Sequence, residues 1–483
     1  MRMLEVGAIP TAALTDTVAD GDDPWWAVAA TQIQAHTSAP RDVTQRKTAA
    51  RAKQETVPQR GVMVGGEFAP LAPATLADSG ISESQIEGLI LKFLLNVGTA
   101  SGRDISDQLK LPFPLISELL RRMKAEQLVG YKSSDAINDY VHQLTPLGVE
   151  RTRRYSEVCT YFGAAPVSLA DYIAAVPQQS LRRQQPTSDN LRRALADLVI
   201  SRELFSQLGQ ALWAGTAMFL YGDPGNGKTT IAERVTAAFG PYIWIPRCLS
   251  IWGEIVRLYD PSVHEAAPIS EPENEVKIDQ RWIRIKRPTI VAGGELTADH
   301  LEMTVSDATG IIEAPLHMKS NGGTLVIDDF GRQRVGTREL LNRWIVPLEK
   351  GHDYLSMPSG RKIQIPFDQL VIFATNLEPR DLVDEAFLRR IPYKIEVRDP
   401  SEEEFRELMR MMSPKLGVEY REGPVDYLIV KHYQERSRRF RYCHPRDLLL
   451  QVRNFCLFHE QRPTLTNEAV DAAAHNYFSI MSW

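Results

Sequence analysis

The chain has 483 residues, more than one ordinary domain needs, and this length points to roughly three domains. Apolar residues make up 43% and charged residues 24%, a balance that excludes a wholly disordered or collagen-like chain and provides material for sizeable cores. The formal net charge of -5 gives no overall attraction to nucleic acid, so such binding would need a local basic patch.

The N-terminal region, residues 1–75, shows no sustained hydrophobic period and is predicted to be flexible. Glu5 and Asp20 lie where a signal peptide needs an apolar core, and no apolar run in the chain approaches the roughly 18 residues of a membrane span. We therefore expect a cytoplasmic protein without a membrane span. Two adjacent indoles, Trp25 and Trp26, are expected either to dock on another surface or to pack on the protein's own body.

Residues 76–155 are predicted to form helices followed by a small hairpin. A helical pattern begins near Ile81, and a proline-containing breaker separates 104–110 from the amphipathic run 115–128, which is a helix-turn-helix arrangement. Two short segments, 128–131 and 140–144, are predicted to pair as strands. The series resembles a winged helix-turn-helix domain.

The chemistry of this domain favours a protein partner or a scaffold role over DNA. The residues that would enter the major groove, 112–116, are Pro, Phe, Pro, Leu and Ile, which offer little to base edges or phosphates. Residues 81–154 contain ten basic and nine acidic residues, so this segment lacks the strong positive charge of a typical DNA-binding domain. DNA stays the alternative partner because of three basic side chains, Arg121, Arg122 and Lys124.

A glycine-rich loop, residues 222–229, follows a short buried strand at 218–221 and precedes a helix. It has the form Gly-x-x-x-x-Gly-Lys-Thr in the strand and helix context that this motif requires. Glycines let successive backbone N–H groups curl around a phosphate, and the helix N-terminus adds its dipole. Lys228 is expected to meet the β and γ phosphates, and Thr229 to ligate Mg²⁺. The predicted nucleotide-binding residues are Gly222, Asp223, Pro224, Gly225, Asn226, Gly227, Lys228, Thr229 and Thr230.

An acidic pair follows a second apolar strand. Residues 324–327 are apolar or Thr, and Asp328 and Asp329 come directly after them. A carboxylate at the end of a strand next to the glycine-rich loop can hold the metal ion, so Asp328 joins Thr229 as a predicted Mg²⁺ partner. Asp329 is the candidate for polarising the attacking water.

With these two motifs in this order, the chain resembles the AAA+ ATPases over about residues 190–483. Asn376 follows an apolar strand where that superfamily carries its sensor 1 residue. Arg390, with Arg389 as second choice, stands where the arginine finger reaches a neighbouring subunit, and Arg446 stands at sensor 2. The resemblance implies that Asp329, Asn376, these two finger candidates and Arg446 are catalytic. One departure is Asp329, where the superfamily usually has Glu.

The resemblance implies an α/β fold with a parallel-sheet ATPase core. Residues 156–190 are expected to be a connector, and the core is expected at 191–398 with an insertion at 241–322. An α-helical lid is expected at 399–483. The winged-helix-like domain and the flexible tail precede these parts.

The resemblance also implies ATP and Mg²⁺ as cofactors and a homo-oligomeric ring, most often of six subunits, because a finger in this position acts across an interface. The first expectation is a ring-forming ATPase motor that remodels an unknown protein client. The alternative is a nucleic-acid-associated ATPase or transcription regulator that uses the winged domain and the arginines Arg436, Arg438, Arg439 and Arg441. A third reading, which Asp329 keeps open, is a nucleotide-gated scaffold with little turnover.

Overall fold

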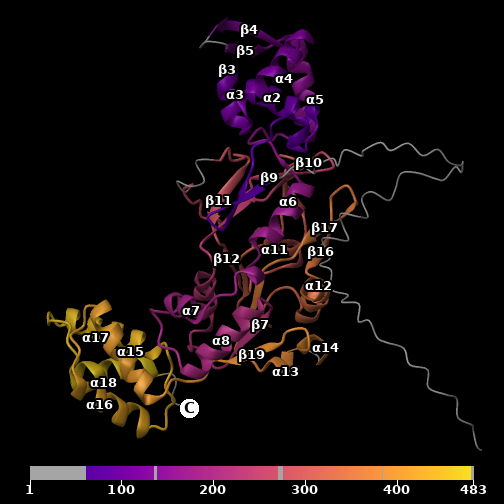
Figure 1. Cartoon of the computed structure of the whole chain (residues 1–483). Coiled ribbons are helices and arrows are strands. Elements are labelled where there is room, and N and C mark those ends of the chain that lie inside the picture. Colours follow the sequence, from indigo (N-terminus) through magenta and orange to yellow (C-terminus); the bar gives the residue numbers. More distant parts are fainter. Residues whose placement is uncertain (1–60, 135–138, 270–275, 383–384, 480–483) are drawn as a thin grey trace, which may run out of the picture. The chain divides into compact units, whose positions relative to one another are not determined.

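The computed structural model describes residues 61–134, 139–269, 276–382 and 385–479 (Figure 1). The predictions of flexibility up to residue 60, and of docking by Trp25 and Trp26, lie outside these residues. Within the described ranges, no helix has both the length and the apolar character that a membrane crossing requires.

The described chain begins with a β-hairpin inside the region that was expected to be flexible. β1 (Gly61–Val64) pairs antiparallel with β2 (Glu67–Pro70). The connecting Gly65 and Gly66 have φ angles of 58° and 87°, a turn conformation that glycine adopts without strain. The prediction of flexibility is therefore wrong for this segment, because a short strand pair around a Gly-Gly turn carries too weak a pattern to stand out in a polar tail.

Four helices and a three-stranded antiparallel sheet follow, in the strand order β3-β5-β4. The α2 helix begins at Ser82, whose side chain accepts a hydrogen bond from the backbone of Gln85, and α3 begins with a capping box of Ser101 and Asp104. The helices and the hairpin predicted between 81 and 155 are present. The bounds are α2 (Glu83–Val97), β3 (Thr99–Ser101), α3 (Gly102–Leu109), α4 (Phe113–Ala125), β4 (Val129–Ser134), β5 (Tyr140–Leu144) and α5 (Pro146–Val158).

A five-stranded parallel sheet forms the central part of the chain, which confirms the predicted parallel α/β sheet. Its strand order is β12-β15-β18-β7-β19, and each neighbouring pair is parallel. Parallel strands share one carboxyl edge, so the loops that follow β7, β15 and β18 lie together at that edge. The strands are β7 (Met218–Tyr221), β12 (Thr289–Ala292), β15 (Thr324–Ile327), β18 (Leu370–Thr375) and β19 (Tyr393–Glu396).

Helices cover both faces of this sheet, since the side chains of a strand alternate between the faces. On one face, Met218 and Leu220 pack with buried residues of α8 and α9; on the other, Phe219 packs in a cluster with Trp344 of α12. The helices of this part are α7 (Ser188–Ala194), α8 (Arg202–Ala214), α9 (Lys228–Arg234), α11 (Leu316–Lys319), α12 (Thr337–Lys350), α13 (Pro379–Leu382) and α14 (Glu385–Leu388).

The segment expected to be one insertion, 241–322, is divided by a strand of the central sheet. β12 pairs in parallel with β15, so its residues belong to the core sheet and the extra structure lies before and after them. The error arose because a short apolar strand does not reveal which sheet it joins. The additional strands are β6 (Val167–Ser168), β8 (Tyr242–Pro246), β9 (Cys248–Ile251), β10 (Glu254–Arg257), β11 (Trp282–Lys286), β13 (Thr304–Val305), β14 (Ile312–Glu313), β16 (His352–Ser356) and β17 (Lys362–Pro366).

The connector expected at 156–190 contributes to this additional structure. β6 pairs in parallel with β9 at the edge of a second five-stranded sheet. The side chain of Tyr172, on α6 (Leu169–Ala175), accepts a 2.8 Å hydrogen bond from Asn321. The short helical turns before the C-terminal helices are η1 (Ala77–Ser79), η2 (Val176–Gln179), η3 (Leu181–Arg183), η4 (Val235–Ala238) and η5 (Ala298–Leu301).

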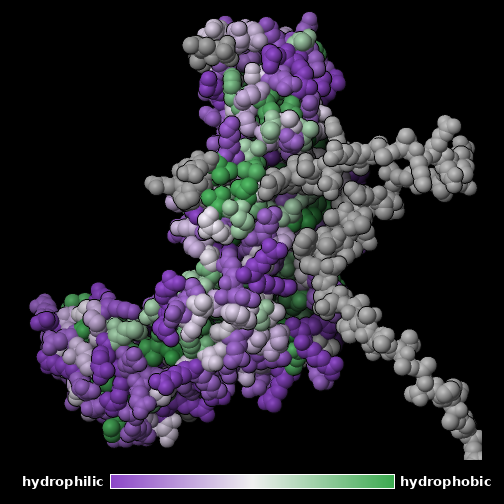
Figure 2. All heavy atoms as spheres, viewed as in Figure 1, coloured by the Kyte–Doolittle hydropathy of each residue, from purple (hydrophilic) through white to green (hydrophobic). Residues whose placement is uncertain are grey.

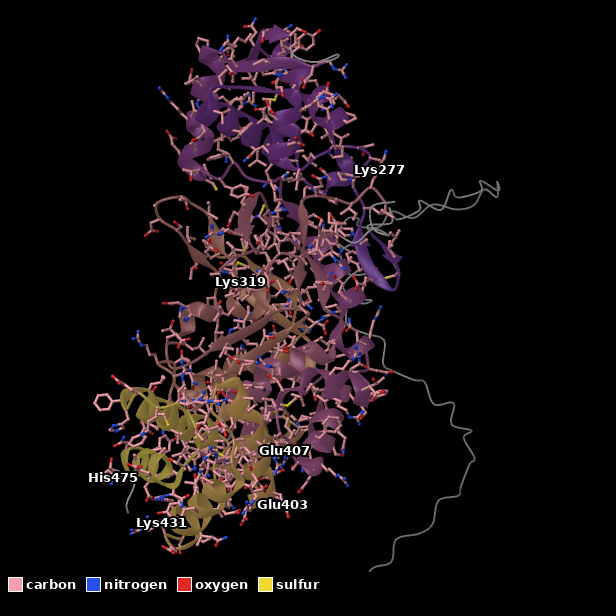
Figure 3. All side chains as sticks on the ribbon, turned by 90° about the vertical axis from the view of Figure 1, so that its left-hand side faces the viewer. Lys277, Lys319, Glu403, Glu407, Lys431 and His475 are labelled. Carbon is pink, nitrogen blue, oxygen red and sulfur yellow. The ribbon has the colours of Figure 1, made fainter. Side chains whose placement is uncertain are left out.

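The C-terminal helices, α15 to α18, enclose a hydrophobic core of their own. α15 begins with a capping box of Ser401 and Glu404. An ion pair of 2.9 Å joins Lys431, labelled in Figure 3, to Asp471. The visible surface of these helices in Figure 2 is mostly hydrophilic, as expected where the apolar residues face inward. The elements are α15 (Glu402–Lys415), α16 (Glu422–Leu428), the π-helix η6 (Ile429–Gln434), α17 (His444–Phe458) and α18 (Asn467–Phe478).

Candidate functional site

A cavity of about 540 Å³ lies at the carboxyl edge of the central sheet, within the usual range for ligand pockets of about 300–1,000 Å³. The glycine-rich loop after β7, the acidic pair after β15 and Asn376 after β18 all line it. Three loops that are far apart in the sequence therefore meet there, because parallel neighbouring strands end at the same edge.

The glycine-rich loop has the backbone that its glycines permit. Gly222, Gly225 and Gly227 have φ angles of 132°, 85° and 81°, a region that side chains with a Cβ disfavour. A Cβ on Gly222 would lie 2.6 Å from the carbonyl oxygen of Val397, and one on Gly225 would lie 2.6 Å from Sγ of Cys443. The loop therefore needs glycine at these positions, both for its backbone conformation and for its close approach to Val397 and Cys443. A loop of this kind can turn successive backbone N–H groups toward an anion.

Lys228 begins the helix that follows this loop, and its side chain is buried. Its ammonium donates to the carbonyl oxygens of Gly222 and Asp223, each at 2.9 Å, and to Oδ1 of Asn376 at 2.7 Å. Burial lowers the pKa of Lys228, and the nearby carboxylates of Asp328, Asp223 and Asp329 oppose that shift. The structure thus brings together Lys228 and Asn376, two residues predicted from separate motifs.

Thr229 and Asp328 also meet in the cavity. The Thr229 hydroxyl lies 3.0 Å and 2.9 Å from the two carboxylate oxygens of Asp328. Mg²⁺ prefers such oxygen ligands and is usually held by one or two carboxylates together with phosphate oxygens and water. In the described part of the chain, no group of three or more His, Cys, Asp or Glu residues is arranged to hold a metal ion. The Thr229 hydroxyl and the Asp328 carboxylate are oxygen donors that could hold Mg²⁺ together with a phosphate ligand.

Asp329 lies beside Asp328 in a left-handed conformation, with a φ of 47°. Asp is one of the few residues other than glycine that adopt this region readily. Its backbone N–H donates to Oδ1 of Asp328 at 3.0 Å, and its own carboxylate accepts from Asn376 Nδ2 at 3.4 Å. The carboxylate is exposed and lines the cavity, where it could receive a proton from a bound water.

The apolar end of the cavity was not predicted from the sequence. The lining there includes Leu198, Val199 and Ile200, which precede α8, and Met411 and Met412 on α15. These side chains can enclose a flat ring such as a nucleobase. No motif signals them, because apolar residues next to or on a helix have the same pattern whether they face a core or a ligand.

Of the three predicted catalytic arginines, only Arg446 lines the cavity. Its side chain is 61% exposed and donates to Asp447 at 2.9 Å. Arg389 pairs with Glu385 at 3.4 Å, and Arg390 lies 3.5 Å from Glu349. The structure therefore brings neither finger candidate to the glycine-rich loop of its own chain.

A different arginine contacts the glycine-rich loop. Arg441 donates to Oδ2 of Asp223 at 2.5 Å and also to Asp399. The sequence placed Arg441 only within a basic cluster, and nothing in it links that residue to Asp223, 218 positions away.

Comparisons with known proteins give one family match and several similar structures. A domain of unknown function, DUF8689, matches residues 401–476, which cover α15 to α17 and most of α18. The Holliday junction branch migration motor RuvB of Thermotoga maritima is 16% identical, with 58% of this chain and 70% of that chain covered and a TM-score of 0.33. NtrX from Brucella abortus in complex with ATP is 13% identical, with 59% and 58% covered and a TM-score of 0.36. No curated protein matches the sequence.

Proposed function

We propose that the chain is a Mg²⁺-dependent ATPase of the AAA+ class that assembles into a ring and remodels a protein partner. The observation that carries the proposal is the meeting of Lys228, Thr229, Asp328, Asp329 and Asn376 around one cavity. A glycine-rich loop in this company is suited to a nucleoside triphosphate, because it offers backbone donors, an ammonium and a metal-binding pair of oxygens.

In this proposal each residue has one role in hydrolysis. Lys228 exchanges its present acceptors for phosphate oxygens, and Thr229 and Asp328 hold Mg²⁺, which supplies charge neutralisation when bound. Asp329 accepts the proton of the attacking water, and Asn376 orients that water from the next strand. Since Asp is one methylene shorter than the Glu usual in the superfamily, we expect slow turnover.

The positions of the finger candidates support the proposed ring. Arg389 has a 75% exposed side chain, and neither it nor Arg390 lines the cavity. An arginine outside its own site can serve a neighbouring copy in a head-to-tail assembly, and such an assembly forms a ring when the rotation between copies closes. We propose six subunits, with one arginine of each subunit completing the next site.

Steady-state ATP hydrolysis by purified full-length protein tests the proposal. Lys228→Ala should abolish nucleotide binding and turnover, whereas Arg390→Ala should leave binding intact and remove turnover. Lys362→Ala, on an exposed position of β17, is the control. Normal hydrolysis by both Arg390→Ala and Arg389→Ala would exclude a finger at these positions.

DNA remains the second candidate partner because of an aromatic and basic cluster in the N-terminal part. Tyr131 stacks on Tyr140 with ring centroids 4.2 Å apart, and the ammonium of Lys124 lies 3.5 Å from the centroid of Tyr131. Stacked aromatic rings with a nearby cation are typical of single-strand binding. Stimulation of hydrolysis by DNA, lost steeply with salt, would favour this candidate. Retention of a specific protein by Asp329→Asn in the presence of ATP would favour the remodelling motor.

A further inference from the structure

We propose that Arg441 is a positioning residue for the nucleotide site, and that it acts by holding the carboxylates of Asp223 and Asp399 together. We call Arg441, Asp223 and Asp399 the clasp. The inference rests on the proposed function and adds a link between the C-terminal helices and the glycine-rich loop.

The clasp is built on short, partly buried contacts. The Arg441 side chain is 20% exposed, and its guanidinium lies between the carboxylates of Asp223 in the glycine-rich loop and Asp399 in the segment before α15. Charge-assisted hydrogen bonds of this kind are roughly twice as strong as neutral ones. Partial burial also weakens the screening by salt that makes most surface pairs ineffective.

Three further hydrogen bonds connect the same loop to segments outside it. The Asn226 side chain is buried, and its Nδ2 donates to Oδ1 of Asp399 at 2.8 Å and to the carbonyl oxygen of Val397 at 3.2 Å. The backbone N–H of Cys443 donates to the carbonyl oxygen of Gly225 at 2.9 Å. Three of the loop's residues are thus bonded to segments that lead into α15 or α17, so the shape of the loop and the position of the C-terminal helices depend on each other.

The charges indicate the direction of the effect. Asp223 places a carboxylate within a loop that is proposed to bind phosphates, and an uncompensated carboxylate there would oppose nucleotide binding. Arg441 neutralises it at 2.5 Å. Removing Arg441 therefore should both release the C-terminal helices and expose the negative charge of Asp223 to the phosphates.

A neighbouring arginine supplies a matched control. Arg439 lies 3.7 Å from the same oxygen of Asp223, but its side chain is 77% exposed. A solvated contact at this distance contributes little. Replacing Arg439 removes the same charge from nearly the same place without breaking the clasp.

Titration of a fluorescent ADP into the full-length protein tests the proposal. Arg441→Ala should weaken binding by about tenfold or more, the scale of losing one charge-assisted contact, whereas Arg439→Ala should stay within about threefold of the unaltered protein. The double variant Asp223→Asn with Arg441→Ala should recover much of the loss, because the glycine-rich loop then carries no uncompensated carboxylate. Asp399 lies outside the loop and keeps its hydrogen bond from Asn226. A general structural defect would show no such rescue. Should Arg441→Ala fold poorly, Arg441→Lys keeps the charge without the planar geometry and should bind with an intermediate affinity.

Hydrogen exchange without nucleotide separates failure of the clasp from failure of the proposed function. If the clasp exists, Arg441→Ala should raise amide exchange in 222–226 and 397–401, and Arg439→Ala should not, even if no nucleotide binds at all. Exchange and ADP affinity both equal to those of the unaltered protein would overturn the clasp. An absence of ADP binding in the unaltered protein, with raised exchange in Arg441→Ala, would uphold the clasp and overturn the ATPase instead.

Discussion

At the scale of single residues, the two adjacent acids of the site have different surroundings. Asp328 is engaged by the Thr229 hydroxyl at both carboxylate oxygens, whereas Asp329 receives a long bond of 3.4 Å from Asn376 and lies exposed in the cavity. A metal-holding role suits the engaged carboxylate, and a proton-accepting role suits the other, which keeps free lone pairs.

The first prediction follows from this difference. Asp329→Asn should lower kcat by about 100-fold or more, in the range typical for loss of a general base, and should change nucleotide affinity by less than about threefold because Asp329 holds no metal. Hydrolysis and equilibrium binding measured on the same preparation check it, with Asp299→Asn, at an exposed position, as the control. An unchanged kcat would assign the base to another residue.

At the scale of elements, the glycine-rich loop and the start of α17 constrain each other. Gly225 has a φ of 85°, and a Cβ there would lie 2.6 Å from Cys443 Sγ. Gly360, in the turn between β16 and β17, has a similar φ of 80° but open space around it. An alanine at Gly360 would therefore introduce backbone strain alone, whereas an alanine at Gly225 would introduce both strain and a clash.

Gly225→Ala should lower thermal stability and weaken nucleotide binding by more than about tenfold, because the strain adds to the clash with Cys443. Gly360→Ala should cost about 1 kcal/mol of stability, the strain alone, and leave nucleotide affinity unchanged. Thermal unfolding and ADP titration of both variants measure this. If Gly225→Ala and Gly360→Ala bound ADP with equal affinity, nucleotide binding would not depend on the present shape of the glycine-rich loop.

The C-terminal helices should also respond to pH through His444. Burial lowers the pKa of His444 to about 4, with a further contribution from Arg441 and an opposing one from Asp447. The pKa of His444 is thus lower in the folded protein than its value of 6.5 in the unfolded chain. The unfolded chain therefore binds the proton more tightly, and acidification favours unfolding. Stability should therefore fall by up to about 3 kcal/mol as pH drops from about 6.5 to 4.

Chemical unfolding followed across this pH range measures the effect of His444. His444→Gln should reduce the slope of the unfolding free energy against pH, since glutamine does not titrate. His459→Gln, at an exposed position, should leave that slope unchanged. Identical slopes in all three proteins would contradict the assignment.

The sequence revealed those parts of the site that local motifs encode. The loop at 222–229 and the acids after β15 were predictable because each depends on a few adjacent residues with fixed geometry. The contact between Arg441 and Asp223, the apolar end of the cavity and the place of β12 in the central sheet were not, because each depends on which distant segments meet. The hairpin at 61–70 was missed because two four-residue strands give little periodicity.

At the scale of the whole molecule, the proposal requires more than one copy of the chain. Lys228, the two acids after β15 and Asn376 line the cavity, whereas Arg389 and Arg390 pair with Glu385 and Glu349. In the proposed ring, a neighbouring copy would supply Arg389 or Arg390 to this site.

Assembly should depend on a bound triphosphate. Sedimentation of Asp329→Asn with ATP and Mg²⁺ should show a species several times the mass of one chain, because the blocked site retains its nucleotide at the interface. Lys228→Ala under the same conditions should sediment as the smaller species. A single copy under every nucleotide condition would exclude the ring and leave the gated scaffold.

The most direct measurement of the central claim is a calorimetric titration of the full-length protein with a non-hydrolysable ATP analogue and Mg²⁺. We predict saturable binding of one nucleotide per chain that Lys228→Ala abolishes while its thermal stability stays close to that of the unaltered protein. Absence of binding, or equal affinity in the folded Lys228→Ala variant, would contradict a nucleotide site at the glycine-rich loop.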